Sequence, residues 1–229
     1  MLVELSAVEK LYNNGEENEV HALHDINLFV REGEMVCLCG PSGSGKTTIL
    51  SIIGCVFPPT SGRAAIAGKK ISRLPDHFLC LYRREKIGFI FQNFNLLPDL
   101  TVLENITLPL YPSGMNPANR RRLAEPLLEK MGIAHRKKFP VGKISGGELQ
   151  RVAICRALIN DPPIVLADEP TAHLDSRLAF QFMEIMEELK GDGKTIVLTS
   201  HDPRVYEHKA IDRVVEVADG RICNTAERV

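Results

Sequence analysis

One stretch decides the fold of this chain: Val36-Cys37-Leu38-Cys39-Gly40-Pro41-Ser42-Gly43-Ser44-Gly45-Lys46-Thr47-Thr48. It begins as an apolar run that is typical of a buried strand, and it then breaks into a loop with three glycines. Residues 46–53 follow with the composition of a helix. Strand, glycine-rich loop and helix in that order are the context that the phosphate-loop pattern G-x-x-x-x-G-K-[ST] requires. We therefore predict a nucleotide-phosphate site on an α/β fold.

Each part of this loop has a physical role in binding phosphate. Glycines let the backbone curl so that successive N–H groups point at an anion, and the helix that follows adds the positive end of its dipole. The Lys46 ammonium would neutralise the outer phosphates, and the Thr47 hydroxyl would be a ligand for Mg²⁺. The nucleotide-binding residues predicted here are Gly40, Pro41, Ser42, Gly43, Ser44, Gly45, Lys46, Thr47 and Thr48.

Composition excludes several classes of function. The chain has 229 residues, of which 44% are hydrophobic and 25% charged, and its net charge is −1, so no basic field invites nucleic acid. The N-terminus lacks the pattern of a signal peptide, and no apolar stretch is long enough to span a bilayer, so any spanning part would come from a separate chain. The six cysteines form no C-x-x-C pair, and we expect them to be reduced and buried.

The periodicity of the chain changes twice. The opening is rich in antiparallel-type strands, and residues 93–160 have helical spacing with few strand signals. Buried strands are predicted at 87–91, 164–167 and 195–200, a helix at 177–190, and a closing hairpin at 214–222. We predict one domain, 1–229, in which an α/β core of residues 1–92 and 161–229 carries an inserted helical subdomain at 93–160.

Polar side chains follow three of the predicted strands. Asp168 and Glu169 come directly after one strand, His201 after another and Gln92 after a third. Because the carboxyl ends of parallel strands meet at one sheet edge, we expect these side chains to gather beside the phosphate loop. Asp168 and Gln92 would join Thr47 as ligands of Mg²⁺, and Glu169 would polarise an attacking water. We predict Glu169, His201 and Lys46 as catalytic residues, with His201 in contact with the γ-phosphate.

A second phosphate-binding device lies in the helical segment, at Ile144-Ser145-Gly146-Gly147-Glu148. Ser145 is a good N-cap, and the two glycines leave a helix N-terminus bare for an anion. One chain is not expected to fold both devices onto one nucleotide, because they lie in separate parts of the fold. A head-to-tail dimer would place Ser145 and Gly146 of one chain on the γ-phosphate held by its partner.

These motifs resemble, over nearly the whole chain, those of the nucleotide-binding subunit of ABC transporters. The resemblance implies ATP and Mg²⁺ as ligands, ATP hydrolysis, a head-to-tail homodimer and an integral membrane permease as partner. It also implies that Tyr12 stacks on adenine. Two positions depart from the family pattern: Glu148 replaces the usual Gln, and Ala172-His173 are unusual. The matching residues are Gly40 to Thr47 (Walker A), Gln92 (Q-loop), Ser145, Gly146, Gly147 and Glu148 (signature), Ile164 to Asp168 (Walker B), Glu169 (catalytic glutamate), 171–175 (D-loop) and His201 (switch histidine).

A finer resemblance concerns residues 87–92 and 96–105, which look like the lipoprotein-releasing and macrolide-exporting subfamily. It implies an ATPase on the cytoplasmic face of the inner (plasma) membrane that powers export or periplasmic extrusion, with a permease and a periplasmic adaptor as partners. The subfamily includes a cell-division ATPase that transports nothing, so a regulatory or assembly ATPase is the alternative function.

Two further alternatives follow from the residues. A GTPase should carry the guanine-reading pattern N-K-x-D, which this chain lacks, and neither a GTPase nor a small-molecule kinase explains Ser145-Gly146-Gly147.

Phe94, Leu96 and Leu97, which follow Gln92, have two interpretations. They form either an apolar seat for the permease or ordinary core of the helical subdomain.

Overall fold

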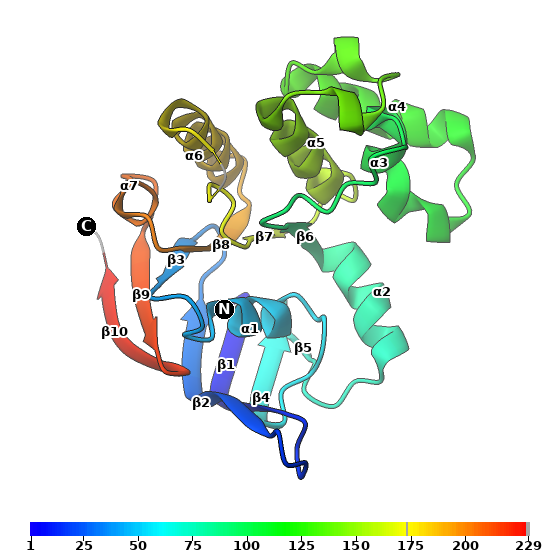
Figure 1. The fold of residues 1–229 in the computed structure, drawn as a ribbon. Coiled ribbons are helices and arrows are strands. Elements are labelled where there is room, and N and C mark those ends of the chain that lie inside the picture. The colour runs from blue at the N-terminus through cyan, green and yellow to red at the C-terminus, as the bar shows by residue number, and fades with distance from the viewer. Residues whose placement is uncertain (173, 228–229) are drawn as a thin grey trace.

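The phosphate-loop strand lies inside a six-stranded sheet in the computed structural model, which describes residues 1–172 and 174–227 (Figure 1). β3 is parallel to its neighbours β8 and β9, and the parallel set continues through β7 to β6. β10 pairs antiparallel with β9, which confirms the predicted closing hairpin. The sheet order is β10 (Arg221–Glu227), β9 (Arg213–Ala218), β3 (Met35–Cys39), β8 (Thr195–Ser200), β7 (Ile164–Ala167) and β6 (Ile87–Ile90).

Both faces of the central strands β3, β8 and β7 are buried, which explains why these strands are largely apolar. Along β3, Met35 and Cys37 belong to one hydrophobic core, whereas Val36 and Leu38 belong to the other. Successive side chains of a strand point to opposite faces, so a strand covered on both sides alternates between two cores. The phosphate loop therefore starts from a strand that is anchored on both faces.

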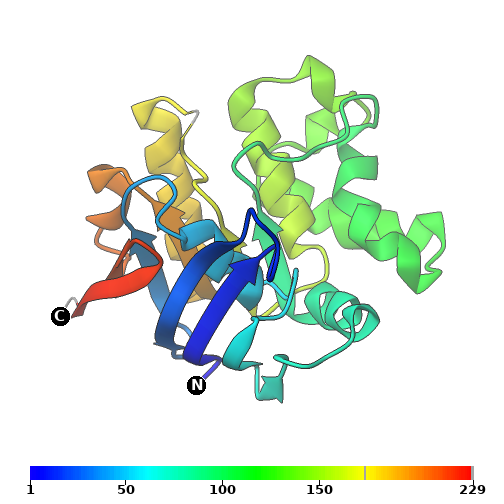
Figure 2. The same ribbon diagram turned by 60° about the horizontal axis from the view of Figure 1, so that its bottom comes forward.

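A second, antiparallel sheet of four strands covers the core that contains Val36 and Leu38 (Figure 2). This sheet confirms the predicted antiparallel opening. Helix α1 (Lys46–Ile53) contributes Ile49, Leu50, Ile52 and Ile53 to this core, so the helix that begins in the phosphate loop is packed from both sides. The strand order is β2 (Val20–Val30), β1 (Val3–Tyr12), β4 (Ser61–Ile66) and β5 (Lys69–Lys70).

The helices from α3 to α5 form a lobe at the upper right of Figure 1, beyond β6. Helix α3 starts at Val102, after the N-cap Thr101, and Pro109 follows soon after its end at Thr107. The lobe comprises α3 (Val102–Thr107), α4 (Pro117–Lys130), α5 (Gly146–Leu158) and the 3₁₀ helices η1 (Leu108–Ser113), η2 (Ala134–Arg136) and η3 (Val141–Lys143).

Three helices complete the core. α6 (Ser176–Gly191) confirms the helix predicted at 177–190 and packs Phe182, Met186 and Leu189 against the face of the sheet opposite α1. α7 (Pro203–Tyr206) follows β8. α2 (Asp76–Lys86) was not anticipated, because Leu79 is its one buried residue and most of its residues are polar or charged.

The expectation that all six cysteines are buried is wrong. Cys80 lies on the exposed side of α2, and Cys223 is exposed on the edge strand β10. Both follow apolar neighbours in the sequence, but α2 and β10 each turn one face to solvent. Burial raises the pKa of the Cys55 thiol to about 11 and that of the Cys155 thiol to about 12, so these two are protonated at neutral pH.

A buried ion pair joins β9 to the turn before the phosphate-loop strand. Arg213 Nε donates to Glu34 Oε1 at 2.8 Å and its NH2 donates to Glu34 Oε2 at 3.1 Å, and only 14% and 7% of the two side chains are exposed. Arg213 also donates to the backbone carbonyl of Phe29 in β2. One guanidinium therefore ties both sheets together at the base of β3.

Arg213→Met should lower the free energy of unfolding by about 3 kcal/mol, because it leaves the Glu34 carboxylate buried without its partner. The measurement is denaturant unfolding. The matched control is Arg31→Met, since Arg31 pairs with Glu227 at 3.2 Å but both side chains are more than 60% exposed. That control should cost less than about 1 kcal/mol, and equal losses in the two variants would contradict the prediction.

Candidate functional site

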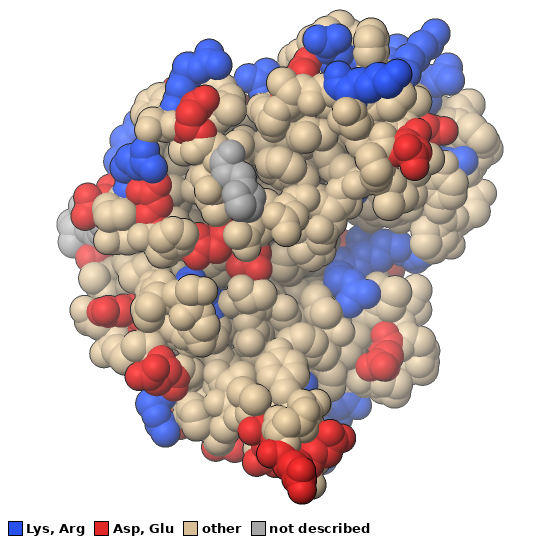
Figure 3. All heavy atoms as spheres, in the orientation of Figure 1, with Lys and Arg blue, Asp and Glu red and all other residues tan. Residues whose placement is uncertain are grey.

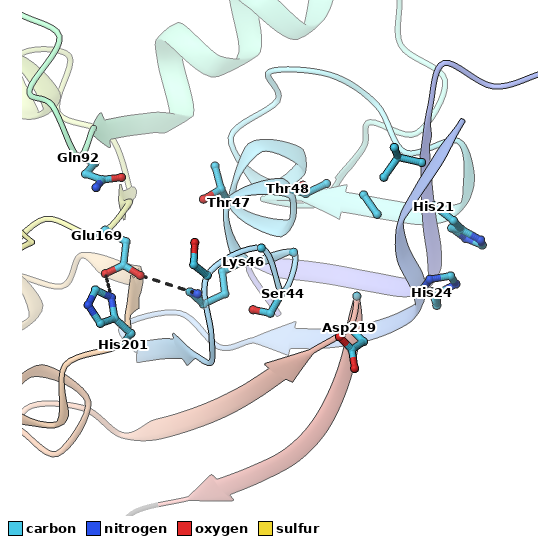
Figure 4. A pocket seen from close by; sticks show the side chains of 16 residues that line it. His21, His24, Ser44, Lys46, Thr47, Thr48, Gln92, Glu169, His201 and Asp219 are labelled. Atoms are coloured by element: carbon cyan, nitrogen blue, oxygen red, sulfur yellow. Dashed lines mark hydrogen bonds and ion pairs between the residues drawn. The ribbon is translucent and has the colours of Figure 1, made fainter. Parts of the chain in front are cut away.

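The carboxyl ends of the parallel strands open onto a pocket of about 530 Å³ (Figure 4). The phosphate loop forms its floor, Gln92, Glu169 and His201 stand at one end, and β2 and the β9–β10 turn close the other. The lining residues include Ser42, Gly43, Ser44, Gly45, Lys46, Thr47, Thr48, Gln92, Glu169, His201, His21, His24 and Asp219. The structure thus brings most of the sequence-predicted residues together.

Backbone geometry requires glycine at two positions of the loop. Gly40 has a φ of 142°, and a Cβ there would lie 2.0 Å from the backbone oxygen of Val217 in β9. Gly45 has a φ of 103°, and its Cβ would lie 2.8 Å from Leu23 Cδ2 in β2. The loop therefore curls tightly enough to cradle an anion because neither position carries a side chain.

Lys46 closes the loop from inside. Its side chain is 6% exposed, and Nζ donates to the carbonyls of Gly40 at 2.9 Å and Pro41 at 2.8 Å. The same Nζ lies 3.8 Å from Glu169 Oε1. Ser44 Oγ is buried without a hydrogen-bond partner among the described residues. A buried hydroxyl without a partner and an ammonium in the same loop fit the oxygens of a phosphate group.

Asp168 and Glu169 are held by a residue that sequence analysis missed. Thr199, fully buried in β8, donates from Oγ1 to Asp168 Oδ1 at 2.8 Å and accepts the backbone N–H of Glu169 at 2.8 Å. Thr47 Oγ1 also donates to Asp168 Oδ1, at 3.1 Å. The available signal was a polar residue two positions before the predicted His201, in a buried strand that also contains Thr195 and Ser200. Thr199 thereby sets the positions of two neighbouring carboxylates at once.

Glu169 and His201 form a pair that faces Lys46 (Figure 4). His201 Nδ1 lies 2.9 Å from Glu169 Oε2; the histidine side chain is 66% exposed, whereas that of Glu169 is 14% exposed. Glu169 has a φ of 43°, a left-handed conformation that is uncommon for a side chain of this kind. The Glu169 carboxylate therefore lies between the ammonium of the loop and an imidazole that solvent reaches.

Two further predicted residues differ in their placement. Gln92 follows β6 and lines the pocket wall. Tyr12 does not line the pocket: its hydroxyl lies 3.4 Å from Thr48 Oγ1, and its ring meets Phe57 edge-on at 5.9 Å. His21 and His24 of β2, which sequence analysis also missed, line the pocket with ring centroids 3.7 Å apart.

The second phosphate-binding device is absent from this pocket's lining. Ser145 caps α5, and its Oγ accepts the backbone N–H of Glu148 at 3.4 Å, while Glu148 Oε2 accepts the Ser145 N–H at 2.9 Å. The hydrogen bond from the Ser145 N–H, followed by the Arg136 guanidinium, lowers the pKa of Glu148 to about 2, so Glu148 is ionised at neutral pH. Gly146 and Gly147, which begin α5, remain apart from the phosphate loop within one chain.

The D-loop residues predicted at 171–175 are described only in part. Asp175 caps α6, and His173 lies outside the described residues.

The donors near Asp168 suit a hard cation that shares its ligands with phosphate. Thr47 Oγ1 and Asp168 Oδ1 are 3.1 Å apart, and both are oxygen donors. Among the described residues, no group of three or more His, Cys, Asp and Glu could hold a metal alone. The residues present fit Mg²⁺, which keeps several waters and takes one or two protein oxygens beside substrate phosphates.

Comparison with known proteins decides the family. A model of the ABC transporter family matches residues 23–172. The chain is 44% identical over 221 residues to an uncharacterised ABC transporter ATP-binding protein of Thermotoga maritima, covering 96% of this chain and 93% of that protein. The chain belongs to the ABC transporter family. It is an ATP-binding and ATP-hydrolysing subunit of that family.

Another relative of this ABC subunit is a much longer protein that also has a permease part in its name. It is 42% identical over 221 residues to the macrolide export ATP-binding/permease protein MacB of Hyphomonas neptunium, covering 96% of this chain but 34% of that protein. The chain therefore spans about a third of the length of this relative. No helix within residues 1–172 and 174–227 is both long enough and apolar enough to cross a membrane.

Solved structures agree with the fold. The dimeric structure of the bacterial ABC transporter cassette MJ0796 matches with a TM-score of 0.89 and 42% identity, covering 98% of both chains. A dimeric post-hydrolysis state of the same cassette, bound to ADP and Pi, matches with a TM-score of 0.88. The fold of this ABC subunit is thus the cassette fold predicted from its sequence.

Thr199→Val should lower kcat for ATP hydrolysis by about tenfold or more, with a smaller change in KM, because Asp168 and Glu169 lose their shared anchor while the phosphate loop is untouched. Steady-state ATPase assays test this. Thr199→Ser is the control, since it keeps the hydroxyl and should retain most of the activity. A valine variant with the wild-type kcat would contradict the role assigned to Thr199.

Proposed function

We propose that this chain is the ATPase subunit of a complex that exports or extrudes a substrate through a separate membrane permease. The observation that carries the proposal is the division of two phosphate-binding devices. The pocket contains the phosphate loop, Glu169 and His201, whereas Ser145 and Gly146 lie on α5 outside it. Two copies arranged head to tail would complete two such pockets, as the dimeric state of MJ0796 shows that a similar cassette can form a dimer.

Gly146 supports an approach by a second molecule at this place. A Cβ at Gly146 would meet nothing within 4 Å, so nothing in the described part of the chain requires glycine there. At Gly147, by contrast, a Cβ would lie 2.8 Å from Leu178 Cδ2, so packing within the chain explains that glycine. A partner's nucleotide that approaches the bare N-terminus of α5 would explain the first glycine.

The residues of the pocket have distinct tasks in hydrolysis. Lys46 would exchange the carbonyls of Gly40 and Pro41 for the outer phosphates of ATP. Thr47, Asp168 and Gln92 would hold Mg²⁺, which when bound neutralises charge on the phosphate oxygens. Glu169 would orient and polarise the attacking water, and His201, held at 2.9 Å from Glu169, would contact the γ-phosphate.

Tyr12 remains the proposed partner of the adenine ring. Its position beside Thr48 at the start of α1 leaves it close to the loop that would hold the phosphates. The aromatic face would stack on the purine at modest energetic gain, about 1–3 kcal/mol for a base on an aromatic ring.

A groove beside Gln92 is the proposed seat of the permease. It has a volume of about 290 Å³ between α2, η1 and α5, and Figure 3 shows Lys and Arg side chains in the hollow between α2 and the helices above it. Its apolar wall includes Phe89 and Phe91, whose rings stack at 4.3 Å. Phe94, Leu96 and Leu97 do not line this groove. Leu96 packs on the core, whereas Leu97 is 49% exposed, so both interpretations of this segment stay open.

Hydrogen bonds connect the wall of the groove to the segment after Gln92, and α5 connects that wall to the Ser145 cap. Arg156, near the end of α5, donates to the backbone carbonyls of Phe94 and Asn95, just after Gln92. The same helix begins at the Ser145 cap. When the dimer closes, movement of α5 would therefore also move the segment after Gln92 and the wall of the groove. A permease seated in the groove, at the cytoplasmic face of the membrane, would be moved with them.

The subfamily of relatives favours export. MacB of Hyphomonas neptunium is described as a macrolide export protein that combines ATP-binding and permease parts. We infer a similar function here, with a membrane permease and a periplasmic adaptor as partners. A non-transporting regulatory ABC ATPase is the alternative, because the same pocket would serve it.

Glu169→Gln should bind ATP-Mg²⁺, form a stable dimer and hydrolyse ATP at least a hundredfold more slowly than the wild type, because the water loses its activating carboxylate. Analytical ultracentrifugation with and without ATP measures the dimer. A monomeric variant that demonstrably binds ATP would overturn the head-to-tail assembly, and wild-type turnover would overturn the role of Glu169.

The same trapped variant tests the membrane partner. Affinity-tagged Glu169→Gln, recovered from solubilised membranes with ATP-Mg²⁺, should carry a permease with it. Recovery of soluble proteins alone would favour the regulatory alternative.

Gly146→Ala should leave the unfolding free energy within about 1 kcal/mol of wild type, since the new methyl group meets open space. ATP-dependent dimerisation and turnover should fall at least tenfold, because the methyl group lies where the partner's phosphate approaches. Gly191→Ala is the control: Gly191 also lies in a helix with open space around it, but at the far end of α6. A Gly146→Ala variant with normal dimerisation would contradict the proposed interface.

A further inference from the structure

Glu148 gathers three polar contacts at the start of α5. Its Oε2 accepts the Ser145 N–H and the Ser145 hydroxyl, both at 2.9 Å, and its Oε1 accepts Arg136 Nε at 2.7 Å. The Glu148 side chain is 18% exposed, so this carboxylate is largely withdrawn from water. The Ser145 hydroxyl thus donates to a carboxylate of its own chain.

This arrangement raises a problem of charge. In the proposed dimer, a triphosphate approaches the N-terminus of α5 and needs the Ser145 hydroxyl as a donor. A carboxylate hydrogen-bonded to that hydroxyl repels the phosphate and competes with it for the proton. An amide at the same position would carry no charge, so the acidic residue of this chain needs compensation that a glutamine would not need.

Among the described residues, Arg136 is the cation closest to Glu148 and the one best placed to give that compensation. It lies in η2, its Nε contacts Oε1 at 2.7 Å, and its guanidinium lies 5.1 Å above the ring of Phe139, which limits its freedom. His135 Nε2 is farther from the same oxygen, at 3.7 Å, and its side chain is 62% exposed. The next cation along the chain, Lys137, is paired with Glu125 at 3.3 Å instead.

We propose that Arg136 and Glu148 act together as positioning residues for Ser145. Arg136 cancels the charge of Glu148 and holds its carboxylate in the cap, so that the Ser145 hydroxyl can turn to the γ-phosphate bound by a partner chain. The inference rests on the head-to-tail dimer proposed above. It makes Arg136 part of the second phosphate site although the residue is twelve positions from Glu148 in sequence and does not line the nucleotide pocket.

The test is a double-variant cycle in the Glu169→Gln background, where ATP-driven dimers do not decay by hydrolysis. Arg136→Gln should raise the dimer dissociation constant with ATP-Mg²⁺ by about tenfold. Glu148→Gln should dimerise at least as tightly as the parent, because it removes the charge while it keeps an acceptor for the cap. Arg136→Gln combined with Glu148→Gln should fall within about twofold of Glu148→Gln alone.

Two controls separate this role from a structural one. Lys137→Gln removes one positive charge from the same segment without touching Glu148, and it should leave the dimer constant within about twofold of the parent. Binding of a fluorescent ATP analogue to dilute monomers should be unchanged in every variant, since neither Arg136 nor Glu148 lines the phosphate-loop pocket. Arg136→Lys should restore part of the loss.

The outcomes are decisive. An Arg136→Gln variant that dimerises as tightly as the parent overturns the inference. The inference also fails if Arg136→Gln weakens dimerisation equally with Glu148 present and with Glu148→Gln, because that result would indicate a general packing defect. An equal loss in Lys137→Gln overturns it too. Failure of the Glu169→Gln parent to dimerise with ATP overturns the head-to-tail assembly itself, and with it this role.

Discussion

The tight approach of the phosphate loop to the sheet is the constraint on which the rest of the structure depends. Gly40 lies so close to β9 that a Cβ would be 2.0 Å from the Val217 carbonyl oxygen, and a Cβ at Gly45 would lie 2.8 Å from the Leu23 side chain in β2. The loop can curl around phosphate only if both sheets hold their positions beside it. The buried Arg213–Glu34 pair, which joins β9, the start of β3 and β2, serves that requirement far from the nucleotide.

Parallel strands then bring the reacting groups to one edge. β3, β8 and β7 are in register, so Gly40, His201 and Asp168 leave the sheet at neighbouring points. Thr199 then fixes the positions of Asp168 and Glu169, because its hydroxyl donates a hydrogen bond to the Asp168 carboxylate and accepts one from the Glu169 backbone N–H. A polar group in a buried strand is costly unless it is satisfied, and here both of its hydrogen-bonding functions are used within the site.

The two phosphate-binding devices lie in different places in one chain. The phosphate loop and Glu169 share a pocket, whereas the Ser145 cap lies outside it, where its hydroxyl donates to the Glu148 carboxylate and Arg136 pairs with that carboxylate. An acidic residue at a helix N-terminus stabilises the cap of the isolated chain. The same residue needs a cation once an anion approaches, which is the physical reason to treat the two side chains as a unit.

The sequence by itself determined the phosphate loop, the buried strands, the polar residues after them, the closing hairpin and the capped helix at Ser145, because each is encoded by neighbouring residues. It did not indicate α2, most of whose residues are polar or charged, or the exposure of Cys80 and Cys223. Only the tertiary structure decided that Thr199 anchors Asp168, that His21 and His24 line the pocket, and that Arg136 pairs with Glu148. Those contacts join residues on different elements, and no local pattern specifies which elements the packing of the two cores brings together.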